Sequence, residues 1–279
     1  MRIEDYPQQE PFSDFGRTYR DECLRLSAGI EGEEHAYGSE HPSQGIMVFP
    51  AERPNGIVLI FLHGGGWTNG YKEEMSFLAP RFLEQEISFV TIGYRLAPRY
   101  VFPANLDDAA DAVAKVLSLA DRYKYDRERV FIGGHSAGGH LSSLLALRND
   151  WQAPRNLPAD VLKGCLPISG SYDFTPGAGF AMRPRFLGAE TSLNEVHASP
   201  VFAIQTVSVP FLVAHGSRDF PHLITQAHKF RMVLDAKGAD VQAVELPDDD
   251  HLTVVTSAAR QDSIWIKVAA AWMKRVARL

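Results

Sequence analysis

The sequence predicts an α/β fold in which a mostly parallel β-sheet is covered by helices on both faces. Two observations carry this prediction: strand-like runs alternate with segments of helical periodicity, and most of the runs are continuously apolar. Alternating strands and helices are typical of parallel sheets, whose strands are buried on both faces. With 279 residues the chain is long enough for one large domain, and we expect residues 1–279 to form it.

Seven strands are expected from runs rich in Val, Ile, Leu and Phe. They lie at residues 45–49, 56–62, 87–94, 129–133, 161–169, 209–215 and 240–246. Helices are expected between them, because apolar residues recur at helical spacing over residues 103–120, 139–148 and 265–276. The segment that carries His222 and His228 is also amphipathic, and both histidines are expected on its surface.

Two segments lie outside this alternation. Residues 1–30 form a polar N-terminal arm with one expected helix at residues 14–28, and the sequence leaves open whether the arm packs on the domain or covers a site. Residues 174–200 contain repeated Gly and Pro. A loop of this length inside a compact domain is usually functional, so we expect a short lid-like segment there.

Composition argues against several classes of function. The net charge of −6 disfavours a nucleic-acid or anionic-membrane partner. Cys23 and Cys165 are too few for a disulfide framework or a zinc cluster. The first residues lack the apolar core of a signal peptide, and no window is long enough to span a bilayer. We therefore expect a cytoplasmic protein that acts on a small molecule, and whether it forms a homodimer stays open.

Ser136 is the strongest candidate for a catalytic nucleophile. It lies in Gly134-His135-Ser136-Ala137-Gly138, between an apolar strand and a helical segment. A serine flanked by glycines at a strand-to-helix junction is typical of a nucleophile elbow, where a tight turn exposes the hydroxyl above the sheet.

A glycine-rich loop precedes this serine. His63-Gly64-Gly65-Gly66-Trp67 follows directly on the strand expected at residues 56–62. Acyl transfer develops negative charge on a carbonyl oxygen, which preorganised N–H donors stabilise. We assign the oxyanion hole to the N–H groups of Gly65, Gly66 and Ala137. A plain glycine turn that ends a strand is the alternative reading of this loop.

His251 is the favoured general base. In a fold with this elbow the order along the chain is serine, then acid, then histidine. Of the later histidines, His251 alone lies in the loop between the last strand and the last helix, at the carboxyl end of a strand. His215 ends a strand and is read as structural, and His140 as an internal hydrogen-bonding group.

Asp219 is the favoured acid, because it follows the strand at residues 209–215 and lies 32 residues before His251. Asp248, Asp249 and Asp250 are rival acids, but neighbours in one loop usually diverge and an acidic run is usually solvated. A metal site formed by residues 248–251 lacks a second histidine at helical spacing, so no metal is expected. Trp67 and His135 are expected to contact the substrate.

These residues together resemble the kynurenine formamidase-like branch of the α/β-hydrolases. The similar stretches are residues 63–67, 76–80, 94–98, 134–140, 168–174 and 250–253. The resemblance implies the α/β-hydrolase fold and a serine hydrolase without a cofactor. Members of that family hydrolyse aryl formamides, and their relatives cleave carboxylic esters.

Two features separate the chain from parts of this family. Formamidases of this branch often have an aromatic residue where this chain has Gly66, and three successive glycines are more similar to hormone-sensitive-lipase-like esterases. The residues around Asp219 and after His251 do not match the esterase pattern.

The expected function is hydrolysis of a small aryl formamide, ester or amide through an acyl-enzyme, and the resemblance places N-formylkynurenine first. The alternative is a short-chain carboxylesterase of the hormone-sensitive-lipase-like type. A non-catalytic hydrolase-like binding protein is disfavoured because nucleophile, base, acid and glycine donors are all present. A metal-dependent hydrolase that uses His251 and the acidic run is disfavoured because a second histidine at ligand spacing is missing.

Overall fold

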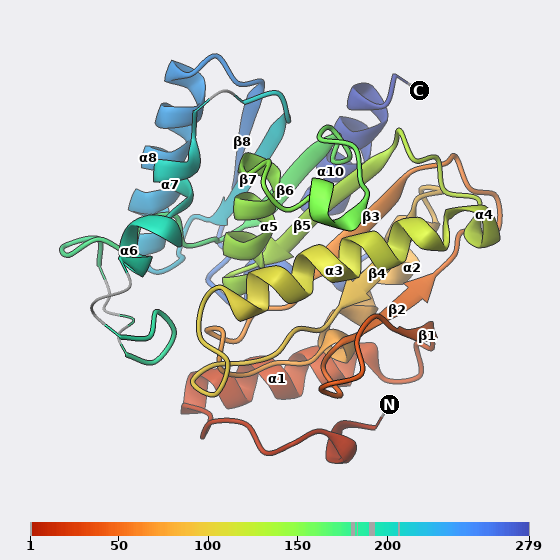
Figure 1. Ribbon diagram of the computed structural model, residues 1–279. Helices are drawn as coiled ribbons and strands as arrows, with labels where there is room; N and C mark the ends of the chain where they lie inside the picture. The colour runs from red at the N-terminus through yellow and green to blue at the C-terminus, as the bar shows by residue number, and fades with distance from the viewer. Residues whose placement is uncertain (1, 180–181, 183, 190–192, 206, 279) are drawn as a thin grey trace.

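The computed structural model describes residues 2–278, except 180–181, 183, 190–192 and 206. At its centre lies an eight-stranded sheet with the order β1-β2-β4-β3-β5-β6-β7-β8. Figure 1 shows helices on both sides of this sheet, with α3, α5 and α8 in front. The predicted mostly parallel sheet with helices on both faces is confirmed.

The strands agree with the predicted runs to within a few residues at each end. They are β1 (Glu33–Ala36), β2 (Gly45–Phe49), β3 (Val58–Leu62), β4 (Ser88–Ile92), β5 (Val130–His135), β6 (Gly164–Ile168), β7 (Phe211–Gly216) and β8 (Val241–Leu246). The strands β1, β2 and β4 pair antiparallel in succession, and every other pairing is parallel.

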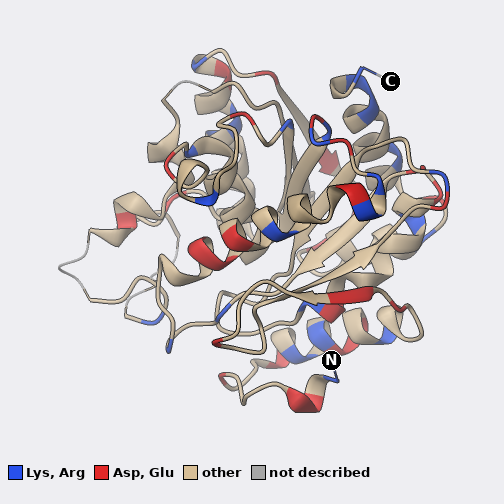
Figure 2. Ribbon diagram, turned by 45° about the vertical axis from the view of Figure 1, so that its right-hand side comes forward, with Lys and Arg blue, Asp and Glu red and all other residues tan. Residues whose placement is uncertain are grey.

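Strand β1 is the one strand in the described chain that the sequence did not predict. Its four residues, Glu33 to Ala36, are mostly charged or polar and exposed. It lies at the edge of the sheet and its residues are largely exposed to water, so it shows no apolar run. The strands from β2 to β7 carry no Lys, Arg, Asp or Glu, as the tan colour of the sheet centre in Figure 2 shows.

Two buried apolar clusters join the helices to the two faces of the sheet. On one face lie α3 (Ala104–Ser118), α5 (Ala137–Leu147) and α8 (Pro221–Ala236); on the other lie α1 (Asp14–Ser27), α2 (Ala79–Leu83) and α10 (Ile264–Val276). Shorter helices are α4 (Ala120–Tyr123), α6 (Asn194–His197), α7 (Pro200–Ala203) and α9 (Thr253–Thr256), with 3-10 turns η1 (Ile3–Asp5), η2 (Lys72–Leu78), η3 (Ala153–Arg155) and η5 (Ser257–Ala259).

The parallel strands place the candidate site residues at one edge of the sheet. The glycine loop follows β3, Ser136 follows β5, Asp219 follows β7, and His251 follows β8. Because these four strands run in the same direction, their carboxyl ends meet at a single edge, which is where open α/β sheets bind ligands.

Among the described helices, none combines the length and apolar character that crossing a membrane requires.

Candidate active site

The backbone at Ser136 has the strained geometry of a nucleophile elbow. Its φ is 54° and its ψ is −114°, between the end of β5 and the start of α5. A Cβ at Gly134 would lie 2.4 Å from the carbonyl carbon of Gly138, and a Cβ at Gly138 would lie 2.2 Å from the carbonyl oxygen of Leu62. Both glycines are therefore required, because the turn brings main chain against main chain.

The structure brings Ser136, His251 and Asp219 together although they are far apart in the sequence. The Nε2 atom of His251 lies 3.0 Å from the Oγ of Ser136. On the other side of the ring, Nδ1 lies 2.8 Å from the Oδ1 of Asp219. This chain of contacts can pass the hydroxyl proton to the imidazole while a carboxylate orients the ring.

Asp219 is buried, and its carboxylate accepts hydrogen bonds on both oxygens. Oδ1 also accepts from the N–H of Phe220 at 2.6 Å, and Oδ2 accepts from the hydroxyl of Ser169. Burial acts to raise the pKa of Asp219, but the hydrogen bonds from His251, Ser169 and Phe220 outweigh it, so the pKa lies below its ordinary value. The carboxyl group is thus held ionised beside the imidazole.

The rival acids next to His251 have other partners. The Oδ1 atom of Asp250 accepts from the N–H groups of Leu252 and Thr253, at 2.9 and 2.8 Å, and so holds the start of α9. The Oδ2 atom of Asp249 accepts from the hydroxyl of Ser257 at 3.3 Å, and the main-chain carbonyl of Asp248 accepts from the side chain of Arg218. Within the described chain, none of these three carboxylates is hydrogen-bonded to His251.

The three N–H groups assigned to the oxyanion hole lie on two loops beside Ser136. Gly65 and Gly66 have φ values of +110° and +60°, and both line the same cavity as Ser136. A Cβ at Gly65 would lie 2.0 Å from the carbonyl oxygen of Asn69, so the loop needs glycine there. In the part of the chain that the structure describes, none of the N–H groups of Gly65, Gly66 and Ala137 donates a hydrogen bond, so all three remain available to a ligand.

Buried rings hold the glycine loop in place. The ring of His63 stacks on that of Tyr94 with centroids 4.2 Å apart, and the Tyr94 hydroxyl donates to the His63 carbonyl at 2.8 Å. Burial lowers the pKa of His63 to about 4, so this ring is neutral at physiological pH.

Trp67 and His135, both expected to contact the substrate, line the cavity at Ser136. The indole N–H of Trp67 donates to Nδ1 of His140 at 3.0 Å, and the other ring nitrogen of His140 lies 2.6 Å from the carbonyl oxygen of Ala198. His140 is therefore an internal hydrogen-bonding group, as expected. The ring of His135 lies 4.8 Å from that of His251, measured between centroids.

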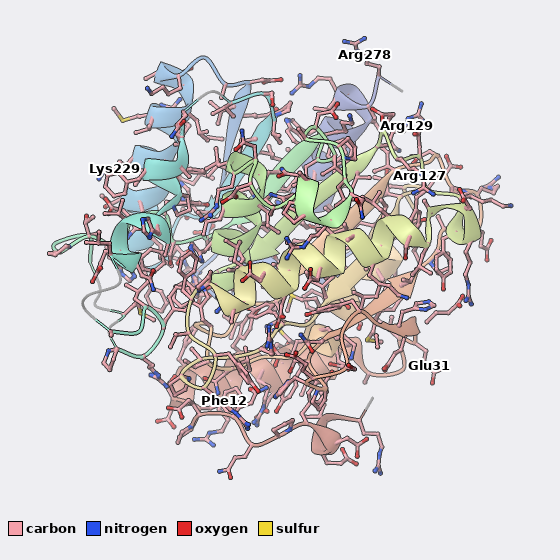
Figure 3. All side chains as sticks on the ribbon, viewed as in Figure 1. Phe12, Glu31, Arg127, Arg129, Lys229 and Arg278 are labelled. Atoms are coloured by element: carbon pink, nitrogen blue, oxygen red, sulfur yellow. The ribbon has the colours of Figure 1, made fainter. Side chains whose placement is uncertain are left out.

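The N-terminal arm forms one wall of this cavity. The sequence had left open whether the arm packs on the domain or covers a site. The cavity has a volume of about 450 Å³ and is lined by Phe15, Tyr19 and Arg20 of α1 as well as by Ser136 and His251. Phe12, labelled in Figure 3, lies just before α1 and lines the same space.

Helix α1 also contacts two histidines of the candidate site. The hydroxyl of Tyr19 lies 2.9 Å from Nδ1 of His135, and the ring of Phe15 lies 6.1 Å from that of His251. The pKa of His135 is lowered to about 3, mainly by burial and secondly by the nearby His251. Tyr19 therefore contacts a neutral ring.

Glu74 is a further cavity residue that no sequence motif indicated. Its side chain is about 1% exposed, and among the described residues its Oε1 atom has no hydrogen-bond partner. Burial raises the pKa of Glu74 to about 8, although Arg20 acts in the opposite direction. A carboxyl group of this kind can accept or donate a hydrogen bond to a bound molecule.

His222 corrects a sequence prediction. It was expected on the surface of its helix, but it lies in the first turn of α8 and lines the cavity. The pKa of His222 is lowered, mainly by burial and secondly by the proximity of His251. The helical pattern could not reveal this position, because the start of α8 directly follows Asp219 and is carried to the site with it.

The lid-like segment contributes to the cavity where it is described. Met182 and Arg185 line it, and Phe186 stacks on Trp67 with centroids 4.4 Å apart. Asp173, just before this segment, pairs at 2.6 Å with Lys229 of α8, which is labelled in Figure 3. Residues 180–181, 183 and 190–192 of the expected segment lie outside the described residues.

Comparison with known proteins finds relatives with two kinds of activity. A family model described as BD-FAE matches residues 46–175. Kynurenine formamidase of Salmo salar is 27% identical over 71% of this chain and 66% of its own length. Esterase LipC of Mycobacterium tuberculosis is 33% identical over 70% of this chain and 52% of its own length. The chain thus spans between half and two thirds of the length of these curated relatives.

Solved structures show the same fold. Esterase B from Lactobacillus rhamnosis superposes with a TM-score of 0.79 at 19% sequence identity, and the match covers 95% of this chain and 94% of that one. At this identity the likeness concerns the fold alone.

Proposed function

We propose that this chain is a serine hydrolase of the α/β-hydrolase superfamily and that it uses Ser136, His251 and Asp219 as its catalytic triad. The observation that carries the proposal is the pair of contacts on the His251 ring, 3.0 Å to Ser136 and 2.8 Å to Asp219, at a cavity open to a small molecule.

The reaction proceeds through an acyl-enzyme. As the Oγ of Ser136 attacks the substrate carbonyl, Nε2 of His251 takes the hydroxyl proton and Asp219 stabilises the imidazolium. The N–H groups of Gly65, Gly66 and Ala137 stabilise the oxyanion. His251 then gives its proton to the departing amine or alcohol, and water activated by the same ring hydrolyses the acyl-enzyme.

The substrate class that we propose is a small aryl formamide, ester or amide, with N-formylkynurenine as the leading candidate. Support comes from the kynurenine formamidase relative and from the aromatic lining of the cavity by Phe15, Trp67 and Phe220. Aromatic walls favour a flat leaving group, and the cavity volume is in the range of small-molecule sites.

A short-chain carboxylesterase is the second candidate, and Gly66 favours it. A Cβ at Gly66 would meet nothing within 4 Å, so the space that an aromatic residue would fill in many formamidases is open here. The esterase relative supports the same reading.

Labelling with a fluorophosphonate tests the triad. The probe reacts only with an activated serine, so the wild-type protein becomes labelled and Ser136→Ala does not. Ser171→Ala is the matched control, because Ser171 lines the same cavity, and it stays labelled. Equal labelling of Ser136→Ala and wild type would show that Ser136 is not the nucleophile.

A rate comparison then separates the two substrate classes. The value of kcat/KM for N-formylkynurenine is measured beside that for a short-chain aryl ester, with Ser136→Ala as the blank. Our proposal expects the formamide to be the better substrate. An advantage of several orders of magnitude for the ester would identify a carboxylesterase.

A further inference from the structure

Three potential metal ligands meet outside the catalytic cavity, on the face of the sheet that α8 covers. His215 of β7 and Glu245 of β8 are register partners on adjacent parallel strands, so their side chains emerge side by side on one face. His228 of α8 completes the group. The ligand atoms of the three side chains all lie within 4.8 Å of one another.

Packing explains why these residues meet. Phe211 and Val213 of β7 belong to the cluster that contains Phe230 of α8. Alternate residues of a strand share a face, so His215 points to the same side, toward α8. His228 stands near the border of the packed helix face, and its ring lies 5.1 Å from that of His215 at an angle of 74°.

His215 has the orientation of a metal-binding histidine. Its Nδ1 atom lies 3.1 Å from the carbonyl oxygen of Gly216. In the neutral ring a contact with a carbonyl places the proton on Nδ1 and leaves the lone pair on Nε2. Metal-binding histidines are commonly held by this kind of bond to a backbone carbonyl.

The other two groups are exposed and able to move toward an ion. His228 and Glu245 are on the surface, and within the described chain neither side chain forms a hydrogen bond or ion pair that would hold it elsewhere. A tetrahedral ion needs donor atoms about 2.0–2.2 Å from its centre. Rotation of two exposed side chains around a buried third one can close the group to that size.

We propose that His215, His228 and Glu245 bind a divalent transition metal ion of the Zn²⁺ type, with water as the remaining ligand. Two imidazoles and one carboxylate are a donor set that Zn²⁺ prefers. The site lies on the elements that carry the proposed triad: β7 leads to Asp219, α8 begins just after it, and β8 leads to His251. A bound ion would tie these three elements together and stabilise them without taking part in the reaction.

Metal titration of the full-length protein tests this site. After dialysis against a chelator, the protein is titrated with Zn²⁺ by calorimetry and with Co²⁺ by visible absorption. We expect one ion per chain, a d–d band typical of nitrogen and oxygen ligands, and a higher Tm with Zn²⁺. His228→Gln and Glu245→Gln, which change exposed side chains, should each weaken binding roughly tenfold or more.

Controls separate this site from other histidines and from the catalytic proposal. His197→Gln changes an exposed histidine on α6 and should bind Zn²⁺ like wild type. Ser136→Ala should also bind like wild type, so the result does not depend on the serine mechanism. Unchanged Zn²⁺ affinity in both His228→Gln and Glu245→Gln, or no binding to wild type, would overturn the proposal.

Discussion

Replacing Glu74 by Gln tests whether a buried carboxyl group destabilises the folded chain. The unfolded chain ionises this group at its ordinary pKa of 4.5, whereas burial in the folded chain raises the pKa to about 8. A pKa raised in the folded state means that the folded chain holds the proton more tightly than the unfolded chain. The contribution of Glu74 to the free energy of unfolding is therefore most favourable below pH 4.5, and it is lost as the pH rises through 8.

The size of the effect follows from the two pKa values. Each pH unit between them corresponds to about 1.4 kcal/mol, so the loss of unfolding free energy reaches about 5 kcal/mol above pH 8. Gln is a neutral group of the same shape and does not ionise. For a domain of this size 1 kcal/mol corresponds to roughly 2 °C in Tm, so Glu74→Gln should raise Tm by on the order of 5–10 °C at pH 9 and by little at pH 5.

Thermal unfolding followed by circular dichroism at pH 5, 7 and 9 measures this difference. Glu84→Gln is the matched control, because Glu84 is a half-exposed carboxylate in the neighbouring helical segment, and its Tm difference from wild type should not grow with pH. A Tm gain for Glu74→Gln that is the same at pH 5 and pH 9, or a loss at pH 9, would refute the argument from burial.

Three further predictions concern the site and its supports. Asp219→Asn should lower kcat about 10⁴-fold with Tm nearly unchanged, and an unchanged kcat would assign the acid elsewhere. Tyr19→Phe leaves Nδ1 of buried His135 without a partner and should reduce the free energy of unfolding by about 1–3 kcal/mol; equal denaturant midpoints would contradict this. Gly138→Ala places a carbon 2.2 Å from the last carbonyl oxygen of β3 and should abolish folding or activity. Gly66→Ala, whose Cβ meets nothing within 4 Å but whose φ of +60° costs an alanine about 1–2 kcal/mol, should lose that much stability and still stay folded and active in a parallel esterase assay.

Most of the fold could be predicted from the sequence because its signals are local. A strand covered on both faces shows itself as an apolar run, and each of the seven predicted runs overlaps a strand of the sheet. The turn at Ser136 is partly visible locally, because Gly134 is required by its contact with Gly138 four residues later, whereas Gly138 is required by the close approach of Leu62 at the end of β3. Strand order then explains why Ser136, Asp219 and His251 meet, since each follows a parallel strand.

Other features depend on contacts between distant segments, which leave no local pattern. Glu74 reads as one charged residue in a polar run, and its burial results from packing of α1 against η2. The short strand β1 is polar because it lies at an edge. The group His215, His228 and Glu245 is visible only once the register of β7 and β8 and the position of α8 are known.

This division explains why the reaction type can be inferred further than the substrate. The groups that would perform acyl transfer lie on strand ends and tight turns, whose geometry local sequence controls. The cavity around them is closed by Phe15 and Tyr19 of α1, by Met182 and Arg185 of the lid-like segment, and by His222 of α8. These walls come from three distant segments without a motif, so a change in them can alter the leaving group without moving the triad. Variants of α1 should therefore change KM and substrate preference more than the chemistry at Ser136, and they are where formamide and ester selectivity should be sought.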